Sequence, residues 1–205
     1  MTSNLIPVRR IAVFGGAFDP PHAAHVTLVR AAVADLHLDE LRVIPTGQAW
    51  HKSQPLSPAH HRLAMAQLAF AGLPRVVVDS RETERAGPSY TVDTLRELKA
   101  QWPDAELFLL MGDDQALALP TWHAWQEVLQ LAIICVADRT ERIGNRPGFV
   151  APKLYKSRFR HLKMSAMTIS ATDIRARIAA HQDLGPLVFE PVARYIDNHH
   201  LYQTV

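Results

Sequence analysis

The sequence has little of what several classes of protein require. Its single cysteine, Cys135, excludes a disulfide framework within the chain, and its place in the apolar run 131–137 favours a buried strand residue over a nucleophile. No apolar run is long enough to span a membrane, and residues 1–10 lack the apolar core of a signal peptide, so we expect a cytoplasmic protein without membrane association. The net charge of +2 is too balanced to indicate nucleic-acid binding.

A dinucleotide-binding Gly-x-Gly-x-x-Gly motif is also absent, which disfavours a hydride-transferring dehydrogenase. What remains is the composition of a folded domain, with 48% apolar and 20% charged residues. The length of 205 residues suits one sizeable core, so we expect a single domain over residues 1–205.

Short apolar runs alternate with helical patterns along the chain. This alternation predicts an α/β fold of three layers, in which helices cover both faces of a parallel sheet. The predicted strands are residues 11–14, 41–45, 75–79, 106–111 and 133–137.

Helix starts are indicated by capping residues and prolines. Pro21 is expected near the first turn of one helix, and Ser57 is expected to cap another that has Pro58 in its first turn. Thr121 is a natural cap for a later helix. The basic segment 153–163 is interpreted as a solvated face.

Residues 15–25 link the first predicted strand to a helix. Gly15 and Gly16 stand where the backbone must turn sharply or approach a ligand closely. His22 and His25 lie three residues apart and share one face at the N-terminal end of the helix, where N–H groups and the positive end of the helix dipole also lie. Taken alone, the two glycines could be a simple turn and the two histidines could be solvated. A metal site is not indicated, because no third ligand accompanies the histidine pair. The combination predicts a site for phosphate oxygens.

A second motif lies at residues 168–175. Ser170 and Asp173 have the spacing of a capping box and begin an amphipathic helix. Capping does not explain Thr172, nor Arg175, which stands one turn into a helix whose N-terminus can already hold an anion. These two residues are therefore left for a role other than capping.

Residues 15–25 resemble the signature of the nucleotidyltransferase superfamily, Gly-Gly-x-Phe-Asp-Pro-x-His-x-Gly-His. More narrowly, the chain resembles bacterial nicotinate mononucleotide adenylyltransferases from about Arg10 to Tyr202. Residues 169–175 match the fixed positions of that family's Ile-Ser-[Ser/Ala]-Thr-x-Ile-Arg motif, and residues 88–91 match its Pro-Ser-Tyr-Thr motif. One departure is Ala24, where the family has glycine.

The resemblance implies a Rossmann-like topology with the active site across the carboxyl ends of the strands. It implies catalytic roles for His22 and His25. The ATP-binding residues that it implies are Gly15, Gly16, Phe18, His22, His25, Arg139, Ile169, Ser170, Thr172 and Arg175. The mononucleotide-binding residues that it implies are Gly16, Ala17, Phe18, His51, Lys52, Tyr90, Thr91, Gly112, Asp114 and Trp122.

Within the second set, the family assigns distinct tasks. The backbone around Tyr90 and Thr91 would receive the carboxylate of the pyridine ring, and Trp122 would stack on that ring. Asp114 would help to position the mononucleotide. The pair His51–Lys52 would face the phosphates of the substrates.

The implied reaction joins ATP and nicotinate mononucleotide, giving deamido-NAD and pyrophosphate. Mg²⁺ is expected with ATP, carried largely by water and phosphate, because no carboxylate cage is evident and no protein metal site is predicted. Three alternatives stay open: a related enzyme with another acceptor, such as nicotinamide mononucleotide or phosphopantetheine; a non-catalytic nucleotide sensor on the same fold; and nucleic-acid binding through residues 153–163. We expect no nucleic-acid partner and leave a homo-oligomer open.

Overall fold

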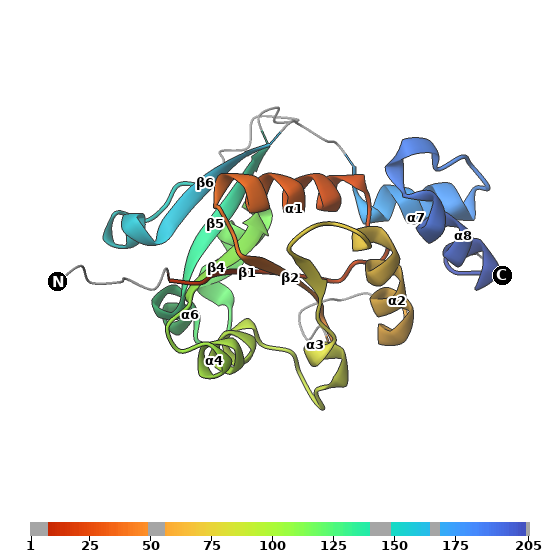
Figure 1. Ribbon diagram of the computed structural model, residues 1–205. Helices are drawn as coiled ribbons and strands as arrows, with labels where there is room; N and C mark the ends of the chain where they lie inside the picture. Colours follow the sequence, from red (N-terminus) through yellow and green to blue (C-terminus); the bar gives the residue numbers. More distant parts are fainter. Residues whose placement is uncertain (1–7, 49–55, 140–148, 165–168, 204–205) are drawn as a thin grey trace.

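The computed structural model describes residues 8–48, 56–139, 149–164 and 169–203 of the chain, and a single six-stranded sheet forms its centre (Figure 1). Each pair of neighbouring strands is parallel, and the strand order is β3-β2-β1-β4-β5-β6. The strands are β1 Arg10–Gly16, β2 Glu40–Pro45, β3 Val76–Val78, β4 Glu106–Gly112, β5 Ala132–Arg139 and β6 Phe159–Met164. The predicted parallel α/β fold is confirmed.

Helices cover both faces of this sheet, with α1 on one face and α4 and α6 on the other (Figure 1). The α-helices are α1 Ala23–Asp35, α2 Ala59–Phe70, α3 Arg81–Glu84, α4 Thr91–Gln101, α5 Asp113–Ala118, α6 Trp125–Leu131, α7 Ala171–Ala179 and α8 Glu190–Asn198. The short 3₁₀ helices are η1 Leu119–Thr121, η2 Lys153–Arg158 and η3 Gly185–Leu187. No helix within the described ranges is long and apolar enough to cross a bilayer.

Burial on both faces explains why the central strands read as continuous apolar runs. Along β1, Ile11 and Val13 belong to the core that packs under α4 and α6, whereas Ala12 and Phe14 belong to the core under α1. Successive side chains of a strand point to opposite faces, so both sets must be apolar when both faces are covered.

The strand order reverses beside β1. From β1 the chain passes outward to β2 and β3, and then crosses to β4, β5 and β6 on the other side. In open parallel sheets, ligands bind beyond the carboxyl ends of the strands at such a reversal. The ends of β1 and β4 are therefore where the fold leaves room for a site.

The basic side chains of residues 153–163 are exposed, except for half-buried Arg158, as the interpretation of a solvated face expects, but the strand in this segment was not predicted. This segment forms η2 and most of the edge strand β6. Within β6, Leu162 is buried while His161 and Lys163 are exposed. An edge strand with one solvated face tolerates charge, which hides its strand character in the sequence.

Pro21 lies directly before His22, the N-cap of α1, and so near its first turn as expected. Two expected caps differ from the structure. Ser57 does not cap α2, because Pro58 is its N-cap. The hydroxyl of Thr121 donates to the Ala118 carbonyl at 2.7 Å, at the end of η1. By contrast, Ser170 caps α7 as predicted, with Oγ accepting from an N–H of the first turn.

Cys135 lies in β5 and is fully buried, as predicted. Burial raises the pKa of its thiol to about 12. Because the thiolate is the reactive form, this cysteine is inert at neutral pH.

Arg62 of α2 is the largest buried side chain, with 1% of its surface exposed. Its guanidinium donates hydrogen bonds to four main-chain carbonyl oxygens, those of Ala17 (3.1 Å), Thr46 (2.6 Å), Gly47 (3.1 Å) and Ser57 (2.8 Å). These carbonyls belong to the loops that follow β1 and β2 and to the residues before α2. One side chain therefore fixes the backbone at the carboxyl ends of two neighbouring strands.

Asp19 is the buried carboxylate that accompanies Arg62. It accepts a hydrogen bond from the Ser57 N–H at 3.1 Å and one from the Tyr202 hydroxyl at 2.5 Å. Its own carbonyl accepts from Arg175 at 2.8 Å. Burial lowers the pKa of the Arg62 guanidinium, and the charge of Asp19 opposes that shift. The C-terminal region is thereby joined to the loop after β1.

We expect Arg62→Met to lower the free energy of unfolding by about 3–5 kcal/mol, because it leaves buried carbonyls without donors and Asp19 without its countercharge. Urea denaturation followed by circular dichroism measures the change. Arg96→Met is the control, since exposed Arg96 pairs only with Asp93 and Glu127 at the surface, where ion pairs contribute little. Equal destabilisation by the two variants would contradict the role given to Arg62.

Candidate active site

A cavity of about 450 Å³ lies at the carboxyl ends of the central strands. Its walls come from the loops after β1, β2 and β4 and from the N-terminal ends of α1, α4, α5 and α7. The predicted site residues that line it are Gly15, Gly16, Ala17, Phe18, His22, His25, Tyr90, Thr91, Gly112, Asp114, Trp122, Ile169 and Ser170. Residues from five separate segments of the sequence therefore meet at one cavity.

Two predicted residues lie beside the cavity and not in its lining. Arg175 donates one hydrogen bond to the Asp19 carbonyl and another to the Thr172 hydroxyl at 3.3 Å. The contact to Asp19 braces the loop of the first motif, and the contact to Thr172 lies within α7. His51 and Lys52 lie outside the described residues, as does the side chain of Arg139.

The cavity also contains side chains that the sequence did not single out, namely Thr46, Glu82, Ser89, Gln115 and His123. Thr46 directly follows β2, so the tendency of ligands to bind at strand ends could have identified it. No local pattern points to Glu82, which comes from the four-residue helix α3.

The two histidines are arranged by the start of α1. Their rings stack with centroids 3.7 Å apart, and the main-chain N–H of His22 donates to Nδ1 of His25 at 3.2 Å. Because Nδ1 accepts, a neutral His25 carries its proton on Nε2. The Phe18 ring meets His25 edge-on at 5.2 Å between centroids and limits its orientation. His25 therefore presents Nε2 as its donor.

The adjacent glycines have different reasons to lack a side chain. A Cβ on Gly16 would lie 3.1 Å from the ring of Phe18, which is buried with a φ of +50°. A Cβ on Gly15 would meet nothing within 4 Å. A side chain at position 16 would thus crowd the Phe18 ring, whereas Gly15 borders open space in the cavity.

Ala24, the departure from the family signature, lines the cavity in the first turn of α1. Alanine suits a helical position better than glycine does.

A second wall is built where the loop after β2 meets the start of α4. The Gly47 N–H donates to Ser89 Oγ at 3.2 Å, and the Ser89 N–H donates to the Gln48 carbonyl at 3.1 Å. Tyr90 is the N-cap of α4 and Thr91 is its first residue. The N–H groups of a first helical turn lack partners within the helix, so this end of α4 offers donors at the cavity.

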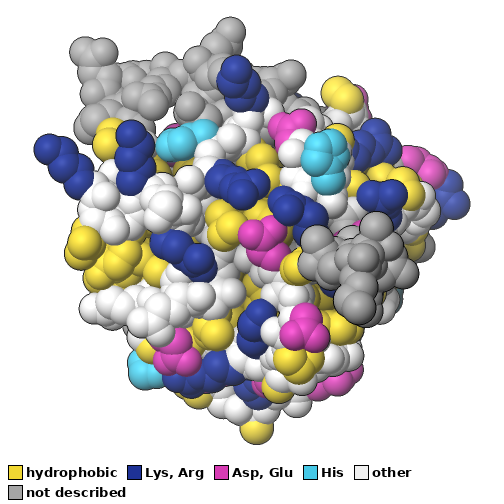
Figure 2. Space-filling view, turned by 60° about the vertical axis from the view of Figure 1, so that its left-hand side comes forward, with side chains coloured by type: hydrophobic (Ala, Val, Ile, Leu, Met, Phe, Trp, Pro, Cys, Tyr) yellow, Lys and Arg dark blue, Asp and Glu magenta, His cyan; other side chains and the backbone are white. Residues whose placement is uncertain are grey.

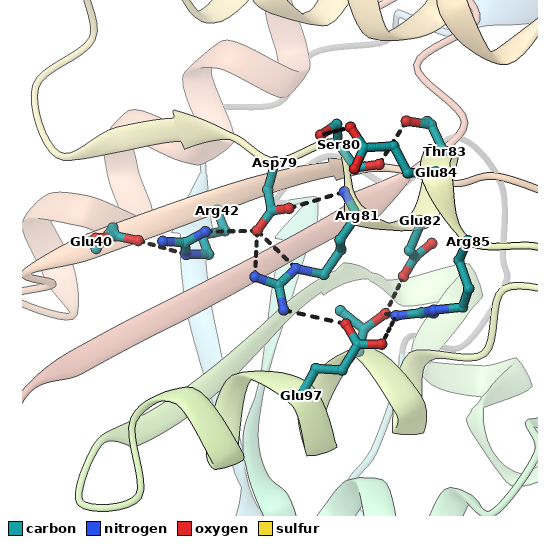
Figure 3. A network of polar contacts seen from close by, with 11 residues as sticks. Glu40, Arg42, Asp79, Ser80, Arg81, Glu82, Thr83, Glu84, Arg85 and Glu97 are labelled. Carbon is teal, nitrogen blue, oxygen red and sulfur yellow. Dashed lines mark hydrogen bonds and ion pairs between the residues drawn. The ribbon is translucent and has the colours of Figure 1, made fainter.

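A network of polar contacts holds α3 between β3 and α4 (Figure 3). Asp79, just after β3, accepts from Arg42 at 2.7 Å and from Arg81 at 2.9 Å. Glu97 of α4 pairs with Arg81 at 3.4 Å and with Arg85 at 2.6 Å. Burial raises the pKa of Asp79, but the hydrogen bonds from the two arginines outweigh it and hold that pKa below its usual value. The Asp79 carboxylate therefore stays ionised at neutral pH and keeps β2 joined to α3.

Comparison with known proteins gives related families and folds. The family described as cytidylyltransferase-like matches residues 13–177. A protein of Albidiferax ferrireducens named probable nicotinate-nucleotide adenylyltransferase is 68% identical over 96% of this chain and 100% of its own. One of the same name from Methylibium petroleiphilum is 45% identical over 97% and 95%. The fold resembles that of Plasmodium falciparum nicotinic acid mononucleotide adenylyltransferase complexed with NaAD, with a TM-score of 0.74, 18% identity, and coverage of 95% of this chain and 97% of that one.

The wall at Gly47 tolerates no side chain. A Cβ there would lie 2.0 Å from the Glu82 carbonyl oxygen, which is main chain and cannot rotate away. We expect Gly47→Ala to destabilise the fold by about 1–3 kcal/mol, measured by chemical denaturation. Gly15→Ala is the matched control, because its Cβ would meet open space. A Gly47→Ala protein as stable as the control would show that this close approach does not constrain the loop.

Proposed function

The chain belongs to the cytidylyltransferase-like family, and we propose that it transfers the adenylyl group of ATP to nicotinate mononucleotide, giving deamido-NAD and pyrophosphate for NAD biosynthesis. One observation carries the assignment: the His22–His25 pair, the start of α7 and the start of α4 line the same cavity. The first two suit the phosphates of ATP, and the third suits a pyridine carboxylate. The reaction is assigned to the cytoplasm, with neither a membrane nor a nucleic acid taking part.

On the ATP side, transfer of a phosphoryl-type group depends mainly on positioning and on stabilisation of charge. A phosphate oxygen of the mononucleotide attacks the α-phosphorus of ATP in line, and pyrophosphate leaves. Nε2 of His25 and the His22 ring would donate to the phosphate oxygens as charge shifts in the transition state.

The β- and γ-phosphates are assigned to the start of α7. The Ser170 hydroxyl already donates to the Asp173 carboxylate at 2.6 Å and accepts from the Asp173 N–H at 3.1 Å. The remaining N–H groups of this first turn would therefore provide donors to the phosphates, with Arg175 beside them.

On the acceptor side, the pyridine carboxylate would accept from the N–H groups at Tyr90 and Thr91. Trp122 lines the cavity and presents an indole on which the pyridine ring can stack. Asp114, in the first turn of α5, would position the mononucleotide. His51 and Lys52 stay predicted contacts to the phosphates, and Arg139 a predicted contact to ATP.

Nucleotidyltransferases of this type generally use a divalent metal with ATP. Among the described residues, no group of three His, Cys, Asp or Glu side chains is placed to hold a metal, and the Asp19 carboxylate is already engaged by Ser57 and Tyr202. Such a site fits Mg²⁺ that arrives with ATP and keeps phosphate oxygens and water as ligands. Bound there, Mg²⁺ would neutralise charge on the triphosphate.

The alternatives have less support. An enzyme that uses phosphopantetheine has no pyridine ring to bind, so it would not need the N–H donors at Tyr90–Thr91 or the Trp122 indole. A non-catalytic sensor stabilises no transition state, so it would not need both histidines at the cavity. For nucleic-acid binding, Arg158 is already bonded to main-chain carbonyls and Arg160 lies over the Phe108 ring. Figure 2 also shows Lys and Arg side chains spread among acidic and apolar ones on one face.

His25→Ala should lower kcat on the order of a hundredfold or more, because it removes a donor to the transferring phosphate. Pyrophosphate release from ATP and nicotinate mononucleotide measures it, and the melting temperature verifies folding. His161→Ala, which removes an exposed imidazole of β6, should leave kcat unchanged. Near wild-type turnover in folded His25→Ala would overturn the mechanism.

The acid form of the mononucleotide should exceed the amide form by at least about tenfold in kcat/KM, because an amide turns an NH₂ group toward one of the α4 N–H donors. Trp122→Ala should raise the KM for nicotinate mononucleotide while the KM for ATP changes little. Steady-state kinetics with both acceptors provide the test. Equal kcat/KM values for the two forms would mean that the pyridine pocket is wrongly assigned.

A further inference from the structure

Glu82 is a buried carboxyl group in the cavity wall that the mechanism above does not use. Only 7% of its surface is exposed, and it lines the cavity together with Ser89, Tyr90 and Thr91. Its Oε1 accepts a hydrogen bond from the hydroxyl of Thr94 at 2.6 Å (Figure 3). A charge on this carboxyl would therefore lie near the end of α4 to which we assign the pyridine carboxylate.

The contacts of Glu82 fix it to the first turns of α4. Thr94 is fully buried, and its hydroxyl also accepts from both terminal nitrogens of Arg85 at 3.3 Å. Thr46, at the end of β2, forms a further side-chain hydrogen bond to Glu82. The carboxyl group thus bridges two walls of the cavity and cannot swing away from α4.

The cations around Glu82 are shared with other carboxylates. Arg85 pairs with Glu97 at 2.6 Å, while Arg42 and Arg81 pair with Asp79. The charged groups that face Glu82 from the packed elements are Arg81 and Arg85 beside it, Glu97 of α4, and the Arg42–Asp79 pair of β2 and β3. Glu82 therefore has no cation of its own among the described residues. Burial raises its pKa, while the Thr94 hydrogen bond and Arg85 oppose the rise.

We propose that Glu82 sets the choice between the acid and amide forms of the pyridine nucleotide by the charge that it places beside the start of α4. The ionised carboxylate repels the carboxylate of nicotinate and favours an acceptor that carries an NH₂ group. The protonated carboxyl removes this repulsion and favours the acid. Glu82 is thus a positioning and selectivity residue, and this inference rests on the proposed function.

The test is the ratio of kcat/KM for nicotinate mononucleotide to kcat/KM for nicotinamide mononucleotide, measured from pH 5, just above the pKa of an ordinary glutamate, to pH 9. The two acceptors have the same ribose and phosphate and use the same catalytic histidines. Titration of the phosphate or of the histidines therefore changes both kcat/KM values alike and cancels in the ratio. The wild-type ratio should fall at least about fivefold as pH rises, because the pKa of Glu82 lies above that of an ordinary glutamate and ionisation adds a repelling charge.

The matched variants separate charge from structure. Glu82→Gln should give a ratio that does not change with pH and that equals or exceeds the wild-type value at pH 5. Glu84→Gln alters an exposed carboxyl on the same helix, bonded to Ser80, and should follow the wild-type profile. Thr94→Val removes the hydroxyl that favours the ionised form, so the fall in its ratio should move to higher pH.

Each result decides a different claim. A wild-type ratio that is flat with pH, or the same falling profile in wild type and Glu82→Gln, would overturn the inference and leave the proposed function standing. If Glu82→Gln does not fold, an unmoved profile in Thr94→Val would overturn the inference equally. If wild-type protein makes no deamido-NAD from nicotinate mononucleotide at any pH, the proposed function itself fails.

Discussion

The site depends on a buried guanidinium. Arg62 is shielded from water and donates to carbonyls of the loops after β1 and β2, so one side chain holds both loops together. A buried cation is costly unless its donors are matched and its charge is offset, and here Asp19 provides the opposite charge. Because Asp19 also joins Tyr202 and Arg175 to the same loop, the histidine motif and the C-terminal region are held in one arrangement.

The elements that the sequence predicted well are those set by local pattern. The strands within continuous apolar runs and the Ser170 cap depend on neighbours within a few residues, and each formed as expected. The cap assigned to Ser57 failed for the opposite reason, whereas the Thr121 hydroxyl donates locally to the Ala118 carbonyl and caps no following helix. Ser57 directs its N–H to Asp19, a partner 38 positions away that no local rule can reveal. Strand β6 was missed because its exposed edge carries charge in place of an apolar run.

The residues that line the cavity can likewise be divided into those that local sequence predicts and those that it does not. Gly15, Gly16 and the two histidines belong to one contiguous motif, so their proximity could be read from spacing, and residues 88–91 mark a helix start. Glu82 reaches the cavity only because Asp79 and Glu97 anchor the arginines of the short helix α3. Arg81 and Arg85 pair with Glu97, which lies 16 and 12 positions away, and no local pattern predicts those pairs. The place of Glu82 in the cavity therefore could not be predicted from the sequence.

The helices that end at the cavity differ in how much of their N-terminal charge they neutralise themselves. α4, α5 and α7 each carry an aspartate in the first turn, whereas the first turn of α1 contains no acidic residue. An acidic residue there offsets the positive end of the helix dipole, so α1 retains more of its attraction for a bound anion than its neighbours do. The two histidines stand at this same end, and alanine at position 24 favours the helix that carries them by about 1 kcal/mol over glycine. The strongest attraction for phosphate thus lies where the proposed reaction builds its transition-state charge.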